Sequence, residues 1–298
     1  MKRFGHLFEQ AFSEDNLLQA FKDAEKGKRS APKVFDFRRE LIGNLDTLHQ
    51  ELWTGEYEPQ PYHVFLVYEP KPRTIFSPQF RDVVVQHAIY RVIYEIFDRT
   101  FIHQSYGSRK GGGTHRASDY AQQSLRATPG KYLLQLDIER FFYSIDHEIL
   151  KDQLAHRIKD KRLLEVIFKF VWYVTEGVGV PIGNLLSQLF ALIYMNPLDH
   201  FIKRELKVKR YCRYVDDFIL FGLTKEQAYT YKEKVEEYLR TKLKLKLSKW
   251  RVARTEQGVN FVGYRTWASR RFVGKHSLYK IKRMAKAGNI EAVTSLLA

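Results

Sequence analysis

The stretch Arg213-Tyr214-Val215-Asp216-Asp217-Phe218-Ile219-Leu220-Phe221 places two adjacent carboxylates inside an apolar and aromatic run. The bulky and β-branched residues on both sides predict two strands, with the aspartates at the tight turn that joins them. Two anions on one hairpin tip repel each other, and a divalent cation is the usual relief. The alternative is a solvated turn whose aspartates only cap backbone amides. A second acidic site upstream favours the metal-binding interpretation.

That second site lies in residues 131–146, KYLLQLDIERFFYSID. An apolar strand is expected over 132–136, and it ends in Asp137, where an acid is costly unless it is paired or metal-bound. Asp146 precedes a helix-like run and is predicted to cap that helix. Asp137 together with Asp216 and Asp217 forms the constellation that a two-metal phosphoryl-transfer site requires. One ion would activate a 3′-hydroxyl, and the other would hold a triphosphate and the leaving oxygen.

These two segments resemble the A and C motifs of the palm domain in reverse transcriptases. Between them, Gly179-Val180-Pro181-Ile182-Gly183-Asn184-Leu185-Leu186-Ser187-Gln188 resembles the B motif, and Gly258-Val259-Asn260-Phe261-Val262-Gly263-Tyr264 resembles the primer grip. Upstream, Lys71-Pro72-Arg73 with residues 81–86, and then residues 105–110, are similar to the two fingers motifs. Six motifs follow in the family's order from about residue 65 to 265. We therefore expect an RNA-directed DNA polymerase with template RNA, a DNA or RNA primer and dNTPs as its partners.

The B motif points to a subgroup. Most bacterial relatives of the intron-encoded type carry Gln before the glycine of this motif and end it with Ser-Pro, whereas this chain has Ile182 before Gly183 and ends in Ser187-Gln188. That variant resembles the reverse transcriptases of diversity-generating retroelements, which copy a template RNA with frequent errors opposite adenine. The resemblance implies a structured template RNA and a small basic accessory protein that forms a pentamer. Ile182 cannot hydrogen-bond, and we hypothesise that this loss loosens discrimination of the template base.

The resemblance also implies roles for single residues. Two Mg²⁺ or Mn²⁺ ions would be held by Asp137, Ile138, Asp216 and Asp217. Phe142 matches a steric gate against the ribose 2′-hydroxyl, although Phe141 is an alternative gate. The proton donor to pyrophosphate would be Lys249 or Arg251, a choice that the sequence leaves open. Further dNTP and template contacts are assigned to Arg73, Arg109, Lys110, Pro181, Ile182, Gly183 and Gln188.

Some of these residues also have an ordinary structural explanation that does not involve a functional site. A phenylalanine after a strand is ordinary core, and basic residues such as Arg73 are common on surfaces. Gly111-Gly112-Gly113-Thr114 precedes a helix-like run, so its amides could approach a phosphate, but a flexible turn explains it equally well.

Composition agrees with a nucleic-acid enzyme. The chain of 298 residues carries a net charge of +16, and residues 203–298 hold 24 Lys and Arg against 9 Asp and Glu. A basic C-terminal third favours a surface that follows phosphates and loses affinity in salt. Cys212 is the only cysteine, which excludes an internal disulfide and a thiolate zinc site and suits a reducing, cytoplasmic setting. No apolar run approaches membrane-spanning length.

The hydrophobic pattern predicts an α+β chain rather than a doubly wound sheet. Helices are expected over 37–52, 81–98, 146–158, 161–175, 184–204 and 225–241, and strands near 64–68, 132–137, 211–215, 218–222, 243–247 and 259–265. We expect a right-hand polymerase with an antiparallel palm sheet packed on helices. Its fingers would span 1–130 and 148–178, its palm 131–147 and 179–265, and its thumb 266–298, short or truncated.

Three rivals remain open at this stage. The chain could be a retron, group II intron or phage-defence reverse transcriptase, against which Ile182 and Gln188 argue. It could be a template-dependent RNA polymerase, which Phe142 disfavours. It could also be a nucleic-acid-binding scaffold without activity, although all three aspartates are present.

Overall fold

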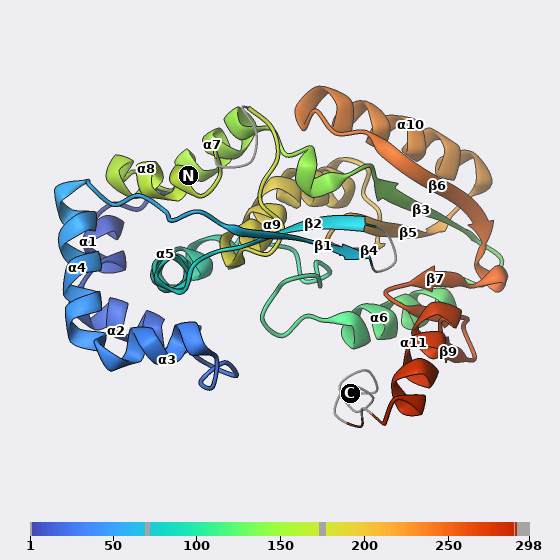
Figure 1. Cartoon of the computed structure of the whole chain (residues 1–298). Coiled ribbons are helices and arrows are strands. Elements are labelled where there is room, and N and C mark those ends of the chain that lie inside the picture. Colours follow the sequence, from blue (N-terminus) through green and yellow to red (C-terminus); the bar gives the residue numbers. More distant parts are fainter. Residues whose placement is uncertain (1, 69–71, 173–176, 289, 291–298) are drawn as a thin grey trace. The chain divides into compact units, whose positions relative to one another are not determined.

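The computed structural model describes residues 2–68, 72–172, 177–288 and 290, and these residues fold into two compact units. The first unit contains Met1–Phe101, Arg140–Pro197 and Leu243–Leu245, and the second contains Ile102–Glu139, Leu198–Lys242 and Lys246–Ala298. Figure 1 shows the chain in sequence colours. The helices and antiparallel strands confirm the α+β class.

A four-stranded antiparallel sheet is the centre of the second unit. Its strand order is β4 (Arg210–Tyr214), β5 (Asp217–Leu223), β3 (Tyr132–Ile138) and β6 (Leu247–Arg254). Consecutive side chains of a strand point to opposite faces, so the register of the pairs decides which residues meet. Asp137 pairs with Asp217, Gln135 with Ile219, and Leu133 with Phe221 on one face of this sheet.

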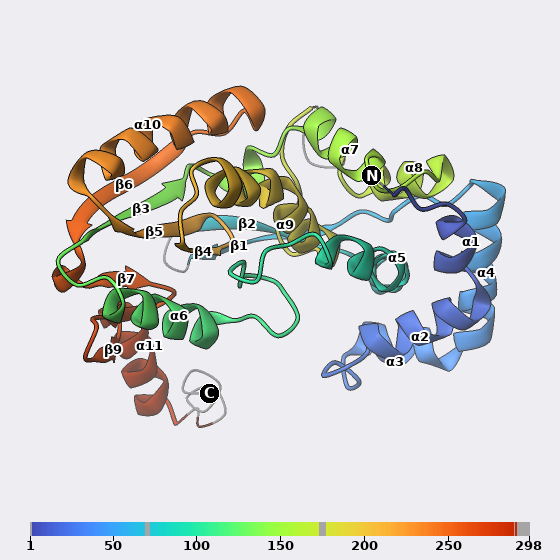
Figure 2. The same cartoon turned by 180° about the vertical axis from the view of Figure 1, so that it is seen from behind.

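Helices cover the two faces of that sheet differently (Figures 1 and 2). On the aspartate face, α6 (Thr114–Arg126) and β7 (Val259–Phe261) contribute to one apolar cluster, which contains Ala117, Ala121, Leu125, Leu133, Cys212, Ile219, Phe221, Ala253, Val259 and Phe261. On the opposite face, α10 (Lys225–Lys242) packs against β3, β5 and β6. The core therefore fills one end of the aspartate face and leaves the carboxylates at the other end.

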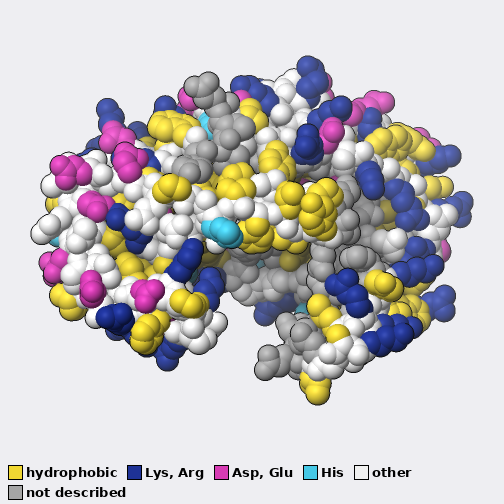
Figure 3. All heavy atoms as spheres, in the orientation of Figure 1, with side chains coloured by type: hydrophobic (Ala, Val, Ile, Leu, Met, Phe, Trp, Pro, Cys, Tyr) yellow, Lys and Arg dark blue, Asp and Glu magenta, His cyan; other side chains and the backbone are white. Residues whose placement is uncertain are grey.

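A smaller antiparallel sheet follows the palm-like sheet in the same unit. It consists of β7, β8 (Tyr264–Thr266) and β9 (Arg271–Val273), and α11 (Lys275–Lys286) comes after it. Lys and Arg side chains gather over the part of the surface formed by β6 to β9 and α11 (Figure 3). Two of them contact Trp267, since the guanidinium carbons of Arg265 and Arg270 lie 4.9 and 5.2 Å from the centre of its ring. This is the basic third that the sequence predicts.

The first unit is mainly helical. It contains one hairpin, β1 (His63–Tyr68) with β2 (Pro72–Ser77), and a one-turn 3₁₀ helix at Phe141–Tyr143. Helices α1 and α2 pack on α5. Its helices are α1 (Leu7–Ala11), α2 (Glu14–Ala24), α3 (Pro32–Arg39), α4 (Leu41–Thr54), α5 (Phe80–Asp98), α7 (His147–Ala155), α8 (Lys161–Lys169) and most of α9 (Leu185–His200).

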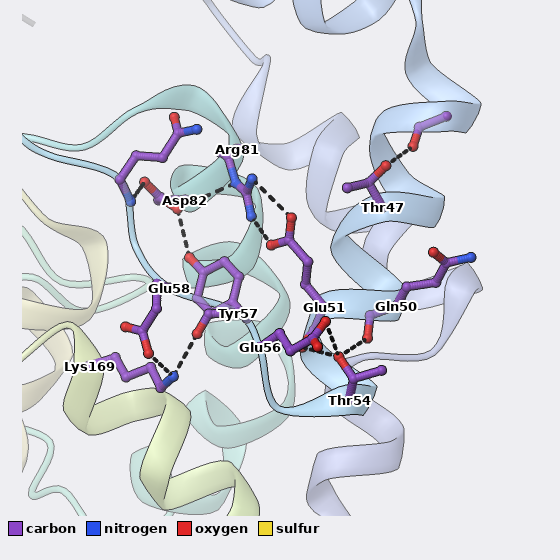
Figure 4. A network of polar contacts seen from close by, with 12 residues as sticks. Thr47, Gln50, Glu51, Thr54, Glu56, Tyr57, Glu58, Arg81, Asp82 and Lys169 are labelled. Carbon is purple, nitrogen blue, oxygen red and sulfur yellow. Dashed lines mark hydrogen bonds and ion pairs between the residues drawn. The ribbon is translucent and has the colours of Figure 1, made fainter.

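A polar network ties three helices of this unit together (Figure 4). The Tyr57 hydroxyl donates to Asp82 Oδ1 at 2.7 Å, and the Gln60 amide donates to Oδ2 at 3.0 Å. Burial raises the pKa of Asp82, which the Tyr57 and Gln60 hydrogen bonds oppose. Arg81 forms an ion pair with Glu51 of α4, and Lys169 of α8 donates to the Tyr57 carbonyl at 2.6 Å.

The predicted strand over 243–247 is wrong, because β6 begins only at Leu247. Lys244 has a left-handed φ of 50°, which a continuous strand excludes, and its ammonium pairs with Asp146 at 2.7 Å. Leu243 and Leu245 are nevertheless buried. The alternation of Leu and Lys over 243–247 therefore reflects the burial of the leucines in an irregular segment, and not pairing of a strand.

Other limits also differ from the prediction. The helix expected over 37–52 is two helices, α3 and α4, separated at Glu40. The strand expected over 259–265 is a hairpin, since Val262 and Gly263 have left-handed φ values of 47° and 83°.

Residues 102–130 group with the four-stranded sheet, whereas 140–147 and 179–197 group with the N-terminal helices. The assignment of fingers, palm and thumb to residue ranges stays a prediction. Lys71 and the apolar stretch after Ile290 lie outside the described residues.

Candidate active site

The predicted hairpin is present, but its turn lies one residue earlier than expected, because Asp217 belongs to β5. Strands β4 and β5 pair antiparallel, and Val215 and Asp216 make the turn between Tyr214 and Asp217. Val215 has a φ of 58°, a left-handed value that costs free energy for a β-branched residue. Asp217 is the register partner of Asp137 on β3. Side chains directly opposite each other have Cβ atoms roughly 5 Å apart, so the hairpin and β3 bring these two carboxylates together.

The electrostatics of Asp217 reflect this crowding. Burial, together with the negative charges of Asp137 and Asp216, raises the pKa of Asp217 to about 7. The Gln135 amide opposes the rise because its Nε2 donates to Asp217 Oδ1 at 3.0 Å. The same nitrogen lies 2.9 Å from the carbonyl oxygen of Asn260 on β7. Gln135 therefore links the carboxylate to the primer-grip-like hairpin.

Asp137 lies beside an irregularity in the sheet. The β3–β6 register shifts between Asp137 and Ile138, so that Ser248 is an extra residue on β6. The Ser248 hydroxyl lies 2.9 Å from Asp137 Oδ2 and 3.2 Å from the Asp137 carbonyl oxygen. Bulges of this kind re-aim side chains at functional sites. The bulge thus supplies Asp137 with a hydrogen-bond donor that regular pairing would have placed elsewhere.

The two candidates for the proton donor occupy different positions. Lys249 is the register partner of Asp137, whereas Arg251 is opposite Gln135, farther from the end of the strand. Arg251 Nη2 donates to Gln257 Oε1 at 3.0 Å, and the Lys249 side chain is exposed. The geometry favours Lys249 because it stands nearest to the carboxylates in the register.

A buried ion pair holds the hairpin turn. Arg213 Nη2 lies 2.5 Å from Asp199 Oδ2, and both side chains are fully buried. Arg213 Nη1 also donates to the carbonyl oxygen of Val215 at 3.0 Å, the residue in the left-handed conformation. The Tyr211 hydroxyl donates to Asp199 Oδ1 at 2.7 Å. Burial alone would lower the pKa of Arg213, but the carboxylate of Asp199 raises it above its ordinary value.

The segment that resembles the second fingers motif packs beside this hairpin. The Arg213 amide donates to the Gln104 carbonyl, and the Tyr106 amide donates to the Arg213 carbonyl, both at 2.9 Å. At Gly107 a Cβ would lie only 2.7 Å from the Val215 nitrogen, so only glycine permits this approach.

Arg109 and Lys110 follow on the same loop. They line a small cavity of about 130 Å³ together with His103, Ser105, Tyr106, Gly111, Gly112 and Arg116. Arg109 Nη1 donates to the Ile102 carbonyl at 2.6 Å, and Arg116 Nη1 donates to the Gly111 carbonyl at 2.5 Å. The glycine run therefore forms part of a concave basic loop.

The remaining predicted residues belong to the first unit, except Ile138. Phe141 is buried, whereas the adjacent Phe142 is half-buried, with ring centroids 5.5 Å apart. Between these two, the exposure favours Phe142 as the residue able to meet a substrate. Arg73 is exposed on β2.

The B-motif residues pack against β2 in the same unit. Pro181 is buried, Ile182 is half-buried and Gln188 is exposed. The Phe76 amide donates to the Ile182 carbonyl at 2.8 Å. Gly183 has a φ of 115°, and a Cβ there would lie 2.9 Å from the Phe76 carbonyl oxygen. The close approach that this glycine permits in the structure is to β2, and an approach by a base pair stays a prediction.

A hard divalent cation fits the carboxylates chemically. Asp137, Asp216 and Asp217 offer only oxygen, the donor that Mg²⁺ and Mn²⁺ prefer, and a cation would oppose both the burial and the repulsion that raise the pKa of Asp217. Ile138 offers its carbonyl oxygen. Among the described residues, no group of three or more His, Cys, Asp or Glu side chains is arranged as a metal site. A bound ion would therefore take further ligands from substrate phosphates or water.

Sequence comparison identifies the family. Residues 69–266 match the model of the reverse transcriptase (RNA-dependent DNA polymerase) family, which is most of the chain and includes the Asp216–Asp217 hairpin, the A-type motif and the B-type motif. The chain belongs to the reverse transcriptase family. It is accordingly an RNA-directed DNA polymerase by family, as the order of the motifs predicts.

Two curated proteins are similar to this chain over most of its length. Protein YkfC of Escherichia coli is 27% identical over 307 residues, which cover 86% of this chain and 80% of YkfC. The group II intron-encoded protein LtrA of Lactococcus lactis is 26% identical, over 83% of this chain and 53% of LtrA. The chain thus spans about half the length of LtrA.

Solved structures agree on the fold. Telomerase from Candida albicans, in complex with a fragment of telomeric RNA, superposes with a TM-score of 0.51 at 15% identity, over 74% of this chain and 46% of that one. Apo telomerase from Candida tropicalis gives a TM-score of 0.52 at 14% identity, over 72% and 49%. The right-hand polymerase fold of this reverse transcriptase is confirmed.

Among the residues that the structure describes, no helix combines the length and apolar character needed to cross a bilayer.

Proposed function

We propose that this chain synthesises cDNA on a template RNA by two-metal nucleotidyl transfer at Asp137, Asp216 and Asp217. The observation that carries the proposal is the register pairing of Asp137 with Asp217, which faces two carboxylates across adjacent strands beside the Asp216 turn. Two ions bound there would supply charge neutralisation and would lower the pKa of a 3′-hydroxyl. Burial raises the pKa of Asp217, and the negative charges of Asp137 and Asp216 raise it further, so bound cations would favour its ionised form.

The chain's own residues position and protonate the reactants. Gln135 and Ser248 orient the two facing carboxylates through their hydrogen bonds. Lys249, opposite Asp137, donates a proton to the departing pyrophosphate oxygen. Arg109 and Lys110 hold phosphate oxygens of the incoming dNTP from the concave basic loop. The half-buried Phe142 excludes a ribose 2′-hydroxyl and so selects dNTPs.

The finer proposal is that copying is error-prone opposite adenine, as in diversity-generating retroelements, with a pentameric basic accessory protein as partner. Ile182 and Gln188 of the B motif support it, because neither follows the intron-type pattern. The similarity to LtrA supports a second candidate, a group II intron-type enzyme. The two candidates differ in fidelity and in their RNA, so both are open to experiment.

The deciding experiment is extension of a DNA primer on an RNA template with dNTPs and Mg²⁺, followed by sequencing of the products. The wild type is compared with Asp216→Asn, which keeps the size of the side chain and removes its charge. We expect Mg²⁺-dependent cDNA that the variant does not make, with errors concentrated at template adenines. Accurate cDNA would retain the polymerase and favour the intron-type enzyme. If neither protein extends any primer, even with its RNA and accessory protein supplied, the catalytic proposal fails.

A further inference from the structure

A second cavity opens at the opposite end of the four-stranded sheet. It has a volume of about 480 Å³ and is formed where α6 leads into β3, where β5 leads into α10, and by the segment before β4. Asp217 begins β5 and Leu223 ends it, so the cavity lies roughly 20 Å from the catalytic carboxylates at the usual rise per strand residue. Its lining is Ala127, Thr128, Pro129, Lys131, Lys207, Val208, Lys209, Arg210, Phe221, Gly222, Leu223, Gln227 and Tyr231.

The charge of this lining has one sign. Four cations, Lys131, Lys207, Lys209 and Arg210, line the cavity, and no Asp or Glu does. Within the described part of the chain, none of the four side chains forms an ion pair. On the adjacent α10, by contrast, Lys232 pairs with Glu236 and Arg240 pairs with Glu237. Four unneutralised positive charges around one cavity create a potential that attracts anions.

The backbone that carries these cations is ordered by its own contacts. Lys203 Nζ donates to the carbonyl oxygens of Val208 and Lys209 at 3.0 and 2.9 Å, and the Tyr231 hydroxyl donates to the Leu206 carbonyl at 3.1 Å. Lys207 takes a left-handed φ of 54°, and the adjacent Val208 is buried. Such a preformed arrangement lowers the ordering cost of binding.

We infer that this cavity, which we call the distal basic cavity, binds phosphodiester groups of the nucleic acid that the enzyme copies, outside the catalytic site. Three lysines and Arg210 suit a chain of phosphates, because lysine binds phosphate oxygens as a point charge and arginine binds them as a fork. Glu256, on a neighbouring turn, is engaged by the Gly130 amide at 2.6 Å and does not line the cavity. The inference rests on the proposed function only for the identity of the nucleic acid as template RNA.

The first test neutralises the cavity and measures RNA affinity as a function of salt. The variant carries Lys131→Gln, Lys207→Gln and Lys209→Gln, and the matched control carries Lys22→Gln, Lys151→Gln and Lys161→Gln at exposed helical positions of the first unit. We expect the cavity variant to bind a long template RNA about tenfold more weakly, with a log–log salt slope smaller by about 2. Affinity and slope equal to those of the control would overturn the inference. Thermal melting of each variant separates lost binding from lost folding.

The second test places a photo-crosslinker in the cavity. Cys212 is the only cysteine and is fully buried, so Lys209→Cys provides a single accessible thiol for the reagent, and Lys161→Cys is its control. We expect the cavity position to crosslink long RNA well above the control position. If inorganic triphosphate alone abolishes the RNA crosslink, the cavity binds free phosphates. If the cavity position crosslinks duplex DNA in preference to RNA, the cavity binds DNA. Either result overturns the assignment of the cavity to RNA. If the enzyme extends primers but shows no crosslink, only the inference about the distal basic cavity is wrong. If RNA crosslinks at the cavity but no primer is extended, only the proposed function is contradicted.

Discussion

Gln135 Nε2 lies 3.0 Å from Asp217 Oδ1, one strand away from it in the sheet. The same nitrogen reaches the Asn260 carbonyl at 2.9 Å, so a single amide group connects the β4–β5 hairpin, β3 and β7. Because burial raises the pKa of Asp217 and this hydrogen bond opposes the rise, Gln135 favours the ionised carboxylate that a cation needs. Gln135 is thus a positioning residue for Asp217.

Replacing Gln135 by leucine should lower kcat for primer extension. A hydrogen bond to a charged group contributes about 1.5–3 kcal/mol, which corresponds to a loss of roughly tenfold or more. Gln135→Glu adds a third facing carboxylate and should cost more. Exposed Gln123→Leu on α6 is the control. Steady-state kinetics with varied Mg²⁺ should show that Gln135→Leu needs more Mg²⁺, and wild-type kcat with unchanged Mg²⁺ dependence would contradict the positioning role.

Lys249 and Arg251 can be separated by alanine substitution. Lys249→Ala should reduce the single-turnover rate roughly 100-fold, the usual contribution of a general acid, because Lys249 is opposite Asp137. Arg251→Ala should stay close to wild type, since that guanidinium is bound to Gln257 at 3.0 Å. The measurement is rapid-quench incorporation of one dNTP. The reverse order of effects would assign the proton transfer to Arg251.

The buried Arg213–Asp199 pair predicts a large loss of stability from a single substitution. Arg213→Met leaves the Asp199 carboxylate buried without its cation, which should lower the free energy of unfolding by about 3–5 kcal/mol. Adding Asp199→Asn removes the unpaired charge and keeps an acceptor for Tyr211, so the double variant should recover part of the loss. Urea unfolding of the three proteins tests this, and equal stability of the single and double variants would refute it.

Ile182 offers a test of fidelity. Ile182→Gln should reduce errors at template adenines, because it restores a hydrogen-bonding side chain at the position before Gly183. Ile182→Leu keeps the apolar character and should keep the wild-type error spectrum. Both side chains can be accommodated, since Ile182 is only half-buried. Sequencing of cDNA from one defined RNA decides the matter, and an unchanged spectrum in Ile182→Gln would remove the proposed link.

The elements that sequence predicts well are those with local patterns. The apolar run before Asp137 and the aromatic flanks of Asp216 and Asp217 specify strands β3, β4 and β5 to within one residue. Asp146 caps α7 as predicted, with its carboxylate accepting from the Ile149 amide at 3.1 Å. Each of these depends on neighbours within a few positions of the chain.

The residues that sequence analysis missed reach the carboxylates only through the pairing register of the strands. Gln135 and Ser248 look ordinary in their own strands, and they meet Asp217 and Asp137 only because strands 82 and 111 residues apart pair in one way. The bulge at Ser248 depends on the pairing of β6 with β3, which no local pattern specifies. The partner of Arg213 is similarly invisible in sequence, because Asp199 comes from the end of a helix.

Asp146 provides a prediction for pH dependence. Burial alone would raise its pKa, but the hydrogen bonds from Lys244 and the Ile149 amide outweigh burial and lower the pKa below the ordinary 3.8. The stabilisation by this carboxylate is therefore present above pH 3.8 and is lost as the pH falls through the lowered value. Asp146→Asn keeps a good helix cap and removes the charge, so it should cost about 0.5–1 kcal/mol at pH 7 and progressively less in acid. Urea unfolding at a series of pH values measures the difference. Lys244→Gln should cost a similar amount, and the double variant should cost no more than either single one; a difference that does not change with pH would show that the ion pair contributes nothing.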